Sequence, residues 1–138
     1  NATSGGEVMD YSKLGDFEIN KLVGDVVFKG LWSCRPGTAG NKSDSWYYGN
    51  ADASLNPLSP LPDYCNDAAA AWPIITANKI SIYAMSDADK RGGWGAEAFH
   101  PNDAYSFNDN PLRAAMIVFL MMQESANVPA NSTGSDLR

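Results

Sequence analysis

The chain has 138 residues and a formal net charge of −6, from 16 acidic and 10 basic residues. Its length fits one hydrophobic core, and its 44% hydrophobic and 19% charged residues exclude a largely disordered chain. The basic residues are scattered and outnumbered, so we expect neither nucleic acid nor a membrane as a partner.

The chain is predicted to fold as one domain with an extension at each end. Residues 1–8 are small and polar and precede Met9, so we interpret them as an N-terminal extension. The domain then covers residues 9–125. Residues 126–138 show no periodicity and are expected to form a C-terminal tail.

The first predicted helix begins at Asp16, which is a suitable N-cap. Ile19, Leu22 and Val23 have the spacing of one helical face, and Gly24 is expected to end the helix as a left-handed C-cap.

A hairpin is predicted to follow. The β-branched and aromatic run VVFKGLW (Val26–Trp32) reads as one strand, and SWYYG (Ser45–Gly49) reads as its antiparallel partner. Turn-forming residues separate the two strands, and a proline-rich stretch follows the second one. Residues 33–62 are therefore expected to form a long hairpin tip and a surface loop.

Asp67 is predicted to cap a second helix in AAAAWPIITANK. The residues spaced for its buried face are Ala68, Ala71, Trp72 and Ile75. Pro73 fits only if the helix kinks there or starts later, with the proline in its first turn.

A second hairpin and a last helix complete the fold. ISIYAM (Ile80–Met85) and WGAEAF (Trp94–Phe99) are the strands, and Asn110 and Pro111 begin the helix. Apolar residues occupy every helical face from Ala114 to Met122, so a sheet, a helix or a second copy must cover several sides. We predict an α+β fold, with a small antiparallel sheet of two hairpins, about three helices, and the C-terminal helix largely buried.

The sequence predicts no metal site, no cofactor and no catalytic residue. DADKRGG is similar to the start of a calcium loop, but Arg91 and Ala98 stand where ligand oxygens belong, so we interpret it as a turn. His100 is the sole histidine, and the cysteines lack zinc-site spacing. His100 with Asp103 or Asp109 would make a general base, although a solvated loop histidine is the simpler interpretation.

The two cysteines and the apolar run indicate where the protein acts. Cys34 and Cys65 would pair only in an oxidising compartment, and nothing in the sequence marks secretion, so we expect them to be reduced. The run Ala114–Met122 is far shorter than the ~18–20 residues that cross a bilayer. We therefore expect a cytoplasmic protein.

Aromatic residues are the first candidates for a binding surface, namely Trp32, Trp46, Tyr47, Tyr48 and Trp94. Strand alternation places Trp46 and Tyr48 on one face and Tyr47 on the other. Either one face is exposed and binds a partner, or the rings pack within the fold. On the first interpretation Trp46, Tyr47 and Trp94 are candidate binding residues.

A site for an anionic small molecule would need other residues. His100 and Arg113 are the candidates for this role, together with Arg91. Met116, Met121 and Met122 are candidate interface residues, because methionine suits adaptable protein contacts, although it also fills cores. Because the last helix is apolar on every face, these methionines favour a homodimer.

Three stretches carry a family resemblance: MDYSKLGDFEINKLV (Met9–Val23), DYCNDAAAAWPIITANKISI (Asp63–Ile82) and NPLRAAMIVFLMMQES (Asn110–Ser125). In this order they resemble the NinX-like proteins, small proteins of unknown function encoded in the nin region of lambdoid phages and in prophages. Through Ala69–Trp72 and Arg113–Ala115 the chain is also loosely similar to a phage α-β-α sandwich domain. The resemblance implies helices packed on a small antiparallel sheet, and it transfers no catalytic residue.

The resulting hypothesis is a phage or prophage accessory protein that acts by binding a host or phage protein. The alternative is a protein that binds or sequesters a small molecule such as a nucleotide signal, and an enzyme ranks third. Residues Gly30–Pro62 have no counterpart that we recognise in the family, so we expect any individual specificity to lie there.

Overall fold

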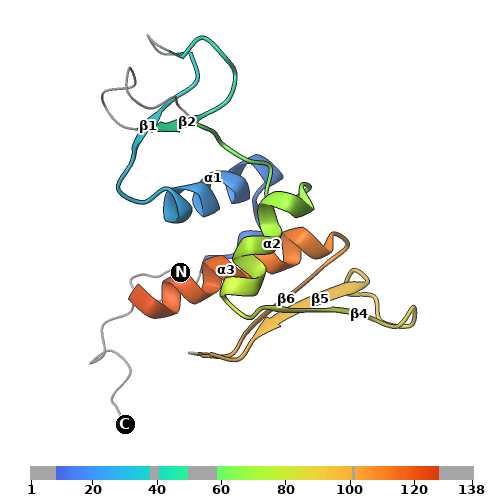
Figure 1. The fold of residues 1–138 in the computed structure, drawn as a ribbon. Coiled ribbons are helices and arrows are strands. Elements are labelled where there is room, and N and C mark those ends of the chain that lie inside the picture. Colours follow the sequence, from blue (N-terminus) through green and yellow to red (C-terminus); the bar gives the residue numbers. More distant parts are fainter. Residues whose placement is uncertain (1–8, 38–40, 50–58, 101, 128–138) are drawn as a thin grey trace.

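The computed structural model describes residues 9–37, 41–49, 59–100 and 102–127 (Figure 1). The expected N-terminal extension and nearly all of the expected C-terminal tail lie outside the described residues. The helices are the short 3-10 helix η2 (Tyr11–Lys13), α1 (Asp16–Val27), α2 (Ala68–Ala77) and α3 (Pro111–Asn127). The strands are β1 (Trp32–Cys34), β2 (Tyr47–Gly49), β3 (Ser59–Pro60), β4 (Ser81–Ala84), β5 (Trp94–Ala98) and β6 (Ala104–Asn108).

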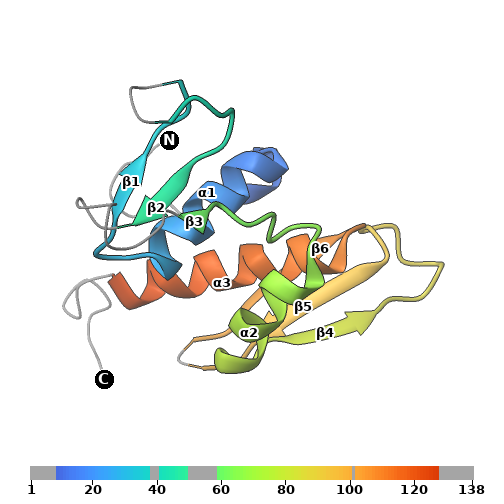
Figure 2. The ribbon, with the colours of Figure 1, turned by 45° about the horizontal axis from the view of Figure 1, so that its top comes forward.

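The elements are layered around α3. Figures 1 and 2 show α3 with the β4–β6 sheet on one side and α1 on the other, while the β1–β3 sheet lies beyond α1. Both sheets are antiparallel, with the orders β1-β2-β3 and β4-β5-β6. The predicted α+β class is confirmed. The two predicted hairpins lie in separate sheets, and each sheet gains a third strand that we did not predict.

Helix α3 forms the centre of the core, as the sequence predicts. The Asn110 side-chain oxygen accepts hydrogen bonds from the backbone N–H groups of Leu112 (2.9 Å) and Arg113 (3.2 Å), which caps the helix. Every residue from Ala114 to Leu120 is buried. Helices α1 and α2 and strands β5 and β6 all pack on α3, so the covering that its apolar faces need comes from within the chain.

Helix α1 is longer than predicted. Gly15, and not the predicted Asp16, is its N-cap residue, and the Glu18 carboxylate accepts a hydrogen bond from the Gly15 N–H at 2.6 Å. The helix continues through Gly24 to Val27, so the predicted C-cap is wrong. Val26 extends the buried stripe of Ile19 and Val23 by a further turn and packs against the core.

The first predicted strand is therefore wrong in its position. Part of VVFKGLW belongs to α1, and β1 begins only at Trp32. The pairing partner was located correctly within Ser45–Gly49, because Tyr47, Tyr48 and Gly49 pair with β1. Packing of α1 on the core outweighs the local β-propensity of the two valines.

Helix α2 begins where the sequence predicts. The Asp67 carboxylate accepts a hydrogen bond from the Ala69 N–H at 3.0 Å, and the helix runs from Ala68 through Pro73, so a later start is excluded. Ala71 and Ile75 are buried, but Ala68 is exposed and Trp72 is 60% exposed, which corrects the predicted buried face.

The β4–β6 sheet has one covered face and one outer face. Ala96 and Ala98 of β5 and Ala104 of β6 are buried on the side that packs against α3. Alternation along the strands sends Glu97, Tyr83 and the aromatic residues of β6 to the opposite side. Figure 1 shows the helices on the covered side of this sheet. Within the described residues, no helix has the length and apolar character needed to cross a membrane.

Candidate binding pocket

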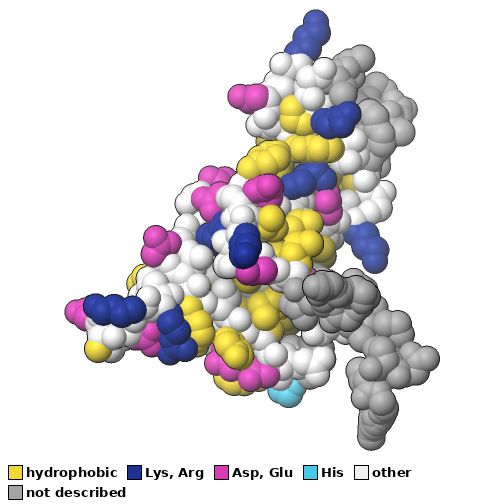
Figure 3. All heavy atoms as spheres, turned by 180° about the vertical axis from the view of Figure 1, so that it is seen from behind, with side chains coloured by type: hydrophobic (Ala, Val, Ile, Leu, Met, Phe, Trp, Pro, Cys, Tyr) yellow, Lys and Arg dark blue, Asp and Glu magenta, His cyan; other side chains and the backbone are white. Residues whose placement is uncertain are grey.

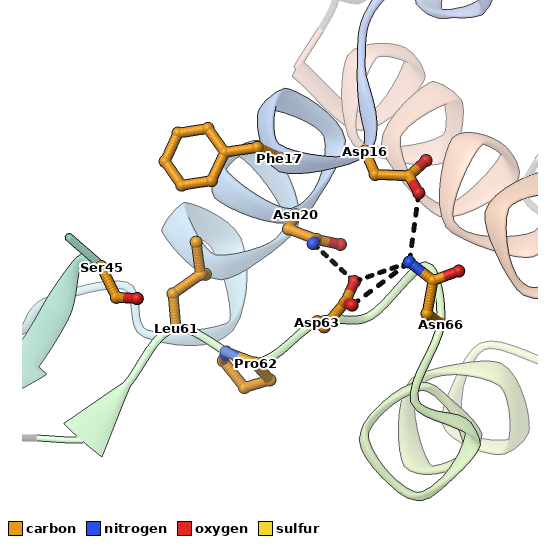
Figure 4. A pocket seen from close by; sticks show the side chains of 8 residues that line it. All are labelled: Asp16, Phe17, Asn20, Ser45, Leu61, Pro62, Asp63 and Asn66. Carbon is orange, nitrogen blue, oxygen red and sulfur yellow. Dashed lines mark hydrogen bonds between the residues drawn. The ribbon is translucent and has the colours of Figure 1, made fainter.

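A pocket of about 300 Å³ lies where the first turn of α1 meets the chain between the two sheets. Figure 4 shows the side chains that line it, which come from α1, from the loop between β1 and β2, and from the segment after β3. They are Asp16, Phe17, Asn20, Ser45, Leu61, Pro62, Asp63 and Asn66.

One side of the pocket is a fixed polar network. Asn20 is only 6% exposed; its amide donates to the Asp63 carboxylate at 2.8 Å, and its oxygen accepts from the Cys65 N–H at 3.0 Å. The Asn66 amide donates to Asp16 at 3.1 Å and to both carboxylate oxygens of Asp63, at 3.1 and 3.2 Å. These bonds tie α1 to the segment after β3 and hold the acceptor atoms in place.

The start of α3 supports this network from behind. The Arg113 guanidinium donates to Asp16 at 3.0 Å and to the backbone carbonyls of Tyr11 and Leu14. The Asn110 amide donates to the Cys65 carbonyl at 2.7 Å and to the Asn66 side-chain oxygen at 3.2 Å. The pocket therefore rests on the core helix.

The other side of the pocket is apolar. Phe17 projects from α1 and is 50% exposed, and Leu61 and Pro62 lie opposite it (Figure 4). Ser45 is positioned by Asn41, whose buried amide donates to the carbonyls of Cys34 (3.0 Å) and Ser45 (2.8 Å). The pocket thus combines an apolar wall with a row of oxygen acceptors.

The two carboxylates of the pocket differ in their charge partners. Asp16 forms an ion pair with Arg113, whose side chain is only 11% exposed. Asp63 receives amide donors from Asn20 and Asn66, and no lysine or arginine of the described chain pairs with it. Since a carboxylate accepts about four hydrogen bonds, Asp63 retains capacity for a donor or a cation. Anions are disfavoured here.

The cysteine and tyrosine next to the pocket are not activated. Burial, and to a smaller extent the neighbouring Asp16 carboxylate, raise the pKa of the Cys65 thiol to about 12. Burial also raises the pKa of Tyr64 to about 12. Both groups stay protonated near neutral pH, which does not suit a nucleophile. The described residues include no group of three metal-binding side chains.

The aromatic candidates of the first hairpin lie beside α1. Tyr48 is buried, stacks on Phe28 with ring centroids 4.5 Å apart, and donates to Asp25 at 3.1 Å. Trp46, on the same strand face, lies under the Lys21 ammonium group, which is 4.2 Å from the ring centroid. Tyr47 is half-buried on the other face.

The remaining predicted residues are scattered over the fold. Trp94 and His100 are exposed at opposite ends of β5, and Arg113 is enclosed behind the pocket. Met116 and Met122 are buried within the chain, whereas Met121 is half-buried. None of these residues lines the pocket.

Sequence reasoning missed the pocket because its polar residues look like ordinary caps and turn formers. One signal was nevertheless present. The six side chains of the network come from the three stretches that carry the family resemblance, and they are Asp16, Asn20, Asp63, Asn66, Asn110 and Arg113.

The fold defines the chain as a small α+β protein with the architecture of a known phage protein. A crystal structure of a phage protein from Bacillus cereus ATCC 14579 is similar to it, with a TM-score of 0.59, 14% sequence identity, and coverage of 85% of this chain and 94% of that one. A comparison with curated proteins gives no match. Residues 10–123 match the family described as Bacteriophage P22, NinX, and the chain therefore belongs to this family.

Proposed function

We propose that this phage accessory protein acts by binding another protein, from the host or the phage, in the cytoplasm of the infected cell. The pocket would receive a protruding segment of that partner. The observation that carries this proposal is the combination of fixed oxygen acceptors with the half-exposed ring of Phe17 across the pocket. Apolar anchors beside satisfied polar groups are typical of protein-binding sites.

The charge of the site supports a protein segment over a nucleotide. Phosphate groups would face Asp16 and Asp63, and Arg113, which lies behind the pocket, already bonds to Asp16 and to backbone carbonyls. A backbone or side-chain N–H of a partner would instead find the unused acceptor capacity of Asp63. A neutral or cationic small molecule is the competing occupant.

The test compares capture of a partner by variants on and off the pocket. Tagged wild-type protein, Phe17→Ala, Asp63→Asn and the control Trp72→Ala would be recovered from infected cells. Trp72 is exposed on α2, outside the pocket. We expect one protein to be recovered with the wild type and with Trp72→Ala and to be lost with both pocket variants. All four proteins should remain folded at the temperature of the experiment, and only Asp63→Asn should melt somewhat lower, because it loses an acceptor for the Asn66 amide.

Two outcomes would contradict the proposal. Recovery of the same partner with all four proteins would place binding elsewhere. A small adduct on the wild type in native mass spectrometry, absent from Phe17→Ala and Asp63→Asn and without a protein partner, would identify the pocket as a small-molecule site.

A further inference from the structure

The outer face of the β4–β6 sheet carries an aromatic surface. Tyr83 is 37% exposed and Tyr105 is 54% exposed, and the ring of Phe107 lies 5.7 Å from that of Tyr105. Tyr83 lies directly over Gly95, because a β-carbon on Gly95 would stand 2.3 Å from the tyrosine ring. The absence of a side chain at Gly95 thus lets the aromatic rings form a continuous layer across three strands.

The hairpin end of this face carries the cations Lys90 and Arg91 beside the carboxylates Asp87 and Asp89, so its formal charge is zero. The Arg91 guanidinium lies over the Phe107 ring, 4.1 Å from its centroid, and donates to the Asp89 carboxylate at 2.6 Å. Its other bonds to Asp89 use Nε, so the Nη1 amino group has no acceptor in the described part of the chain. Arg91 therefore retains an unused donor group at Nη1.

A negative charge marks the opposite end. Glu97 pairs with Tyr105 across the strands, whereas Gly95 pairs with Phe107, so Glu97 lies two residues, or about 7 Å, further from the hairpin. The Asp103 carboxyl hydrogen-bonds to Glu97 and raises the pKa of that carboxyl. In Figure 3 the acidic side chains beside the histidine have no basic neighbour in view.

We propose that this face binds the same face of a second copy of the chain. In such a dimer the β4–β6 sheets of the two copies face each other. A two-fold axis that lies between these facing sheets and runs across their strands reverses the strand direction of the partner. It therefore places Arg91 of each copy against Glu97 and Asp103 of the other, with the aromatic rings packed between them. A two-fold axis along the strands would instead oppose like charges, which disfavours that arrangement.

The size of the face determines how strong this dimer is. Three short strands offer less area than the roughly 800 Å² per partner of a standard interface, so the dimer is expected to be weak and reversible. The charge pairs lie at its rim, and salt should weaken it further. The pocket lies on the α1 side of α3, so dimerisation leaves it open (Figures 1 and 4).

Charge reversal tests the two-fold arrangement directly. Sedimentation velocity across a wide range of protein concentration would be recorded for the wild type, R91E and E97R. The wild type should dimerise as its concentration rises. R91E alone should remain monomeric at every concentration, because both of its contact sites then oppose negative charges. E97R alone should dimerise more weakly than the wild type, because Arg91 of each copy then faces the introduced arginine beside Asp103. An equimolar mixture of R91E and E97R should dimerise, since both sites of the mixed dimer regain opposite charges.

The matched control for R91E is K29E, which also replaces a cation by glutamate, at an exposed position after α1. It should dimerise like the wild type. Amide spectra would verify that every variant is folded, and Tyr105→Ser serves as an uncharged variant that should also weaken the dimer. A wild type that stays monomeric, an R91E variant that dimerises normally, or a mixture that fails to associate would overturn the proposal.

Discussion

Gly24 and Leu61 lie so close together that a β-carbon on Gly24 would stand 2.6 Å from Leu61 Cδ1. The Tyr48 hydroxyl oxygen would lie 3.0 Å from this added β-carbon of residue 24. A glycine inside a helix is less stable than alanine by roughly 1 kcal/mol, so the helix alone does not explain this residue. Gly24 instead allows the β1–β3 sheet and the apolar wall of the pocket to rest directly on α1.

The first prediction follows from this contact. Gly24→Ala should push the Leu61 methyl group and the Tyr48 hydroxyl away from α1. Because the end of the Leu61 side chain can move, the loss in the free energy of unfolding should lie at the lower end of about 1–3 kcal/mol and be partly offset by the gain in helix propensity. Hydrogen exchange should accelerate in β2 but not in β5. In the double variant Gly24→Ala, Leu61→Ala, the colliding methyl group is gone, so exchange in β2 should slow again. If the second substitution has no such effect, the contact does not explain Gly24.

The second prediction concerns Arg113. Arg113→Met keeps the apolar stem but removes the donors to Asp16 and to the carbonyls of Tyr11 and Leu14. Loss of these bonds should lower the free energy of unfolding by about 1–3 kcal/mol, measured by urea denaturation. Lys29→Met, at an exposed position, is the control and should be neutral. Equal denaturation midpoints for the two variants would show that Arg113 does not hold the N-terminal segment.

The third prediction separates the two roles of Asn110. Aspartate caps a helix as well as asparagine does, so Asn110→Asp should keep the cap of α3 while losing the amide bonds to the Cys65 carbonyl and to the Asn66 side-chain oxygen. We expect a loss of about 1–2 kcal/mol for Asn110→Asp and a larger loss for Asn110→Ala, both from thermal unfolding. An aspartate variant as stable as the wild type would mean that the link to Cys65 contributes nothing.

The fourth prediction is a pH dependence. The folded protein holds the pKa of the Cys65 thiol at about 12, above its ordinary value of 9.0. The Cys65 thiol therefore ionises at a lower pH in the unfolded chain than in the folded chain. Its contribution to the free energy of unfolding is fully present below pH 9.0 and is lost as the pH rises from there toward about 12. Denaturation across this range should show the decline, and Cys65→Ala should reduce it. A variant with an unchanged slope would assign the decline to other groups.

Helix starts could be predicted from the sequence because a cap is a local signal. Asp67 before α2 and Asn110 before α3 each satisfy backbone donors within three residues of themselves. The end of α1 could not be predicted in this way. Gly24 has the identity of a C-cap, but its role depends on Leu61, which lies far away in the sequence.

The third strands of the two sheets were missed for a related reason. Strand β3 consists of Ser59 and Pro60 alone, and β6 lies between asparagine and aspartate residues that suggest a turn. Only pairing with β2 and β5 makes these segments strands. The pocket depends even more on tertiary structure, since Asn20 and Asp63 are 43 positions apart.

The attachment of the β1–β3 sheet has a consequence for how this protein can change. Cys34 and Tyr48 are buried outside the main hydrophobic cluster, and the sheet rests on the side of α1 that faces away from α3. Substitutions in this sheet should therefore leave the folding of the rest of the chain intact while they reshape one rim of the pocket. The part of the chain that shapes this rim is thus separate from the part that holds the scaffold together.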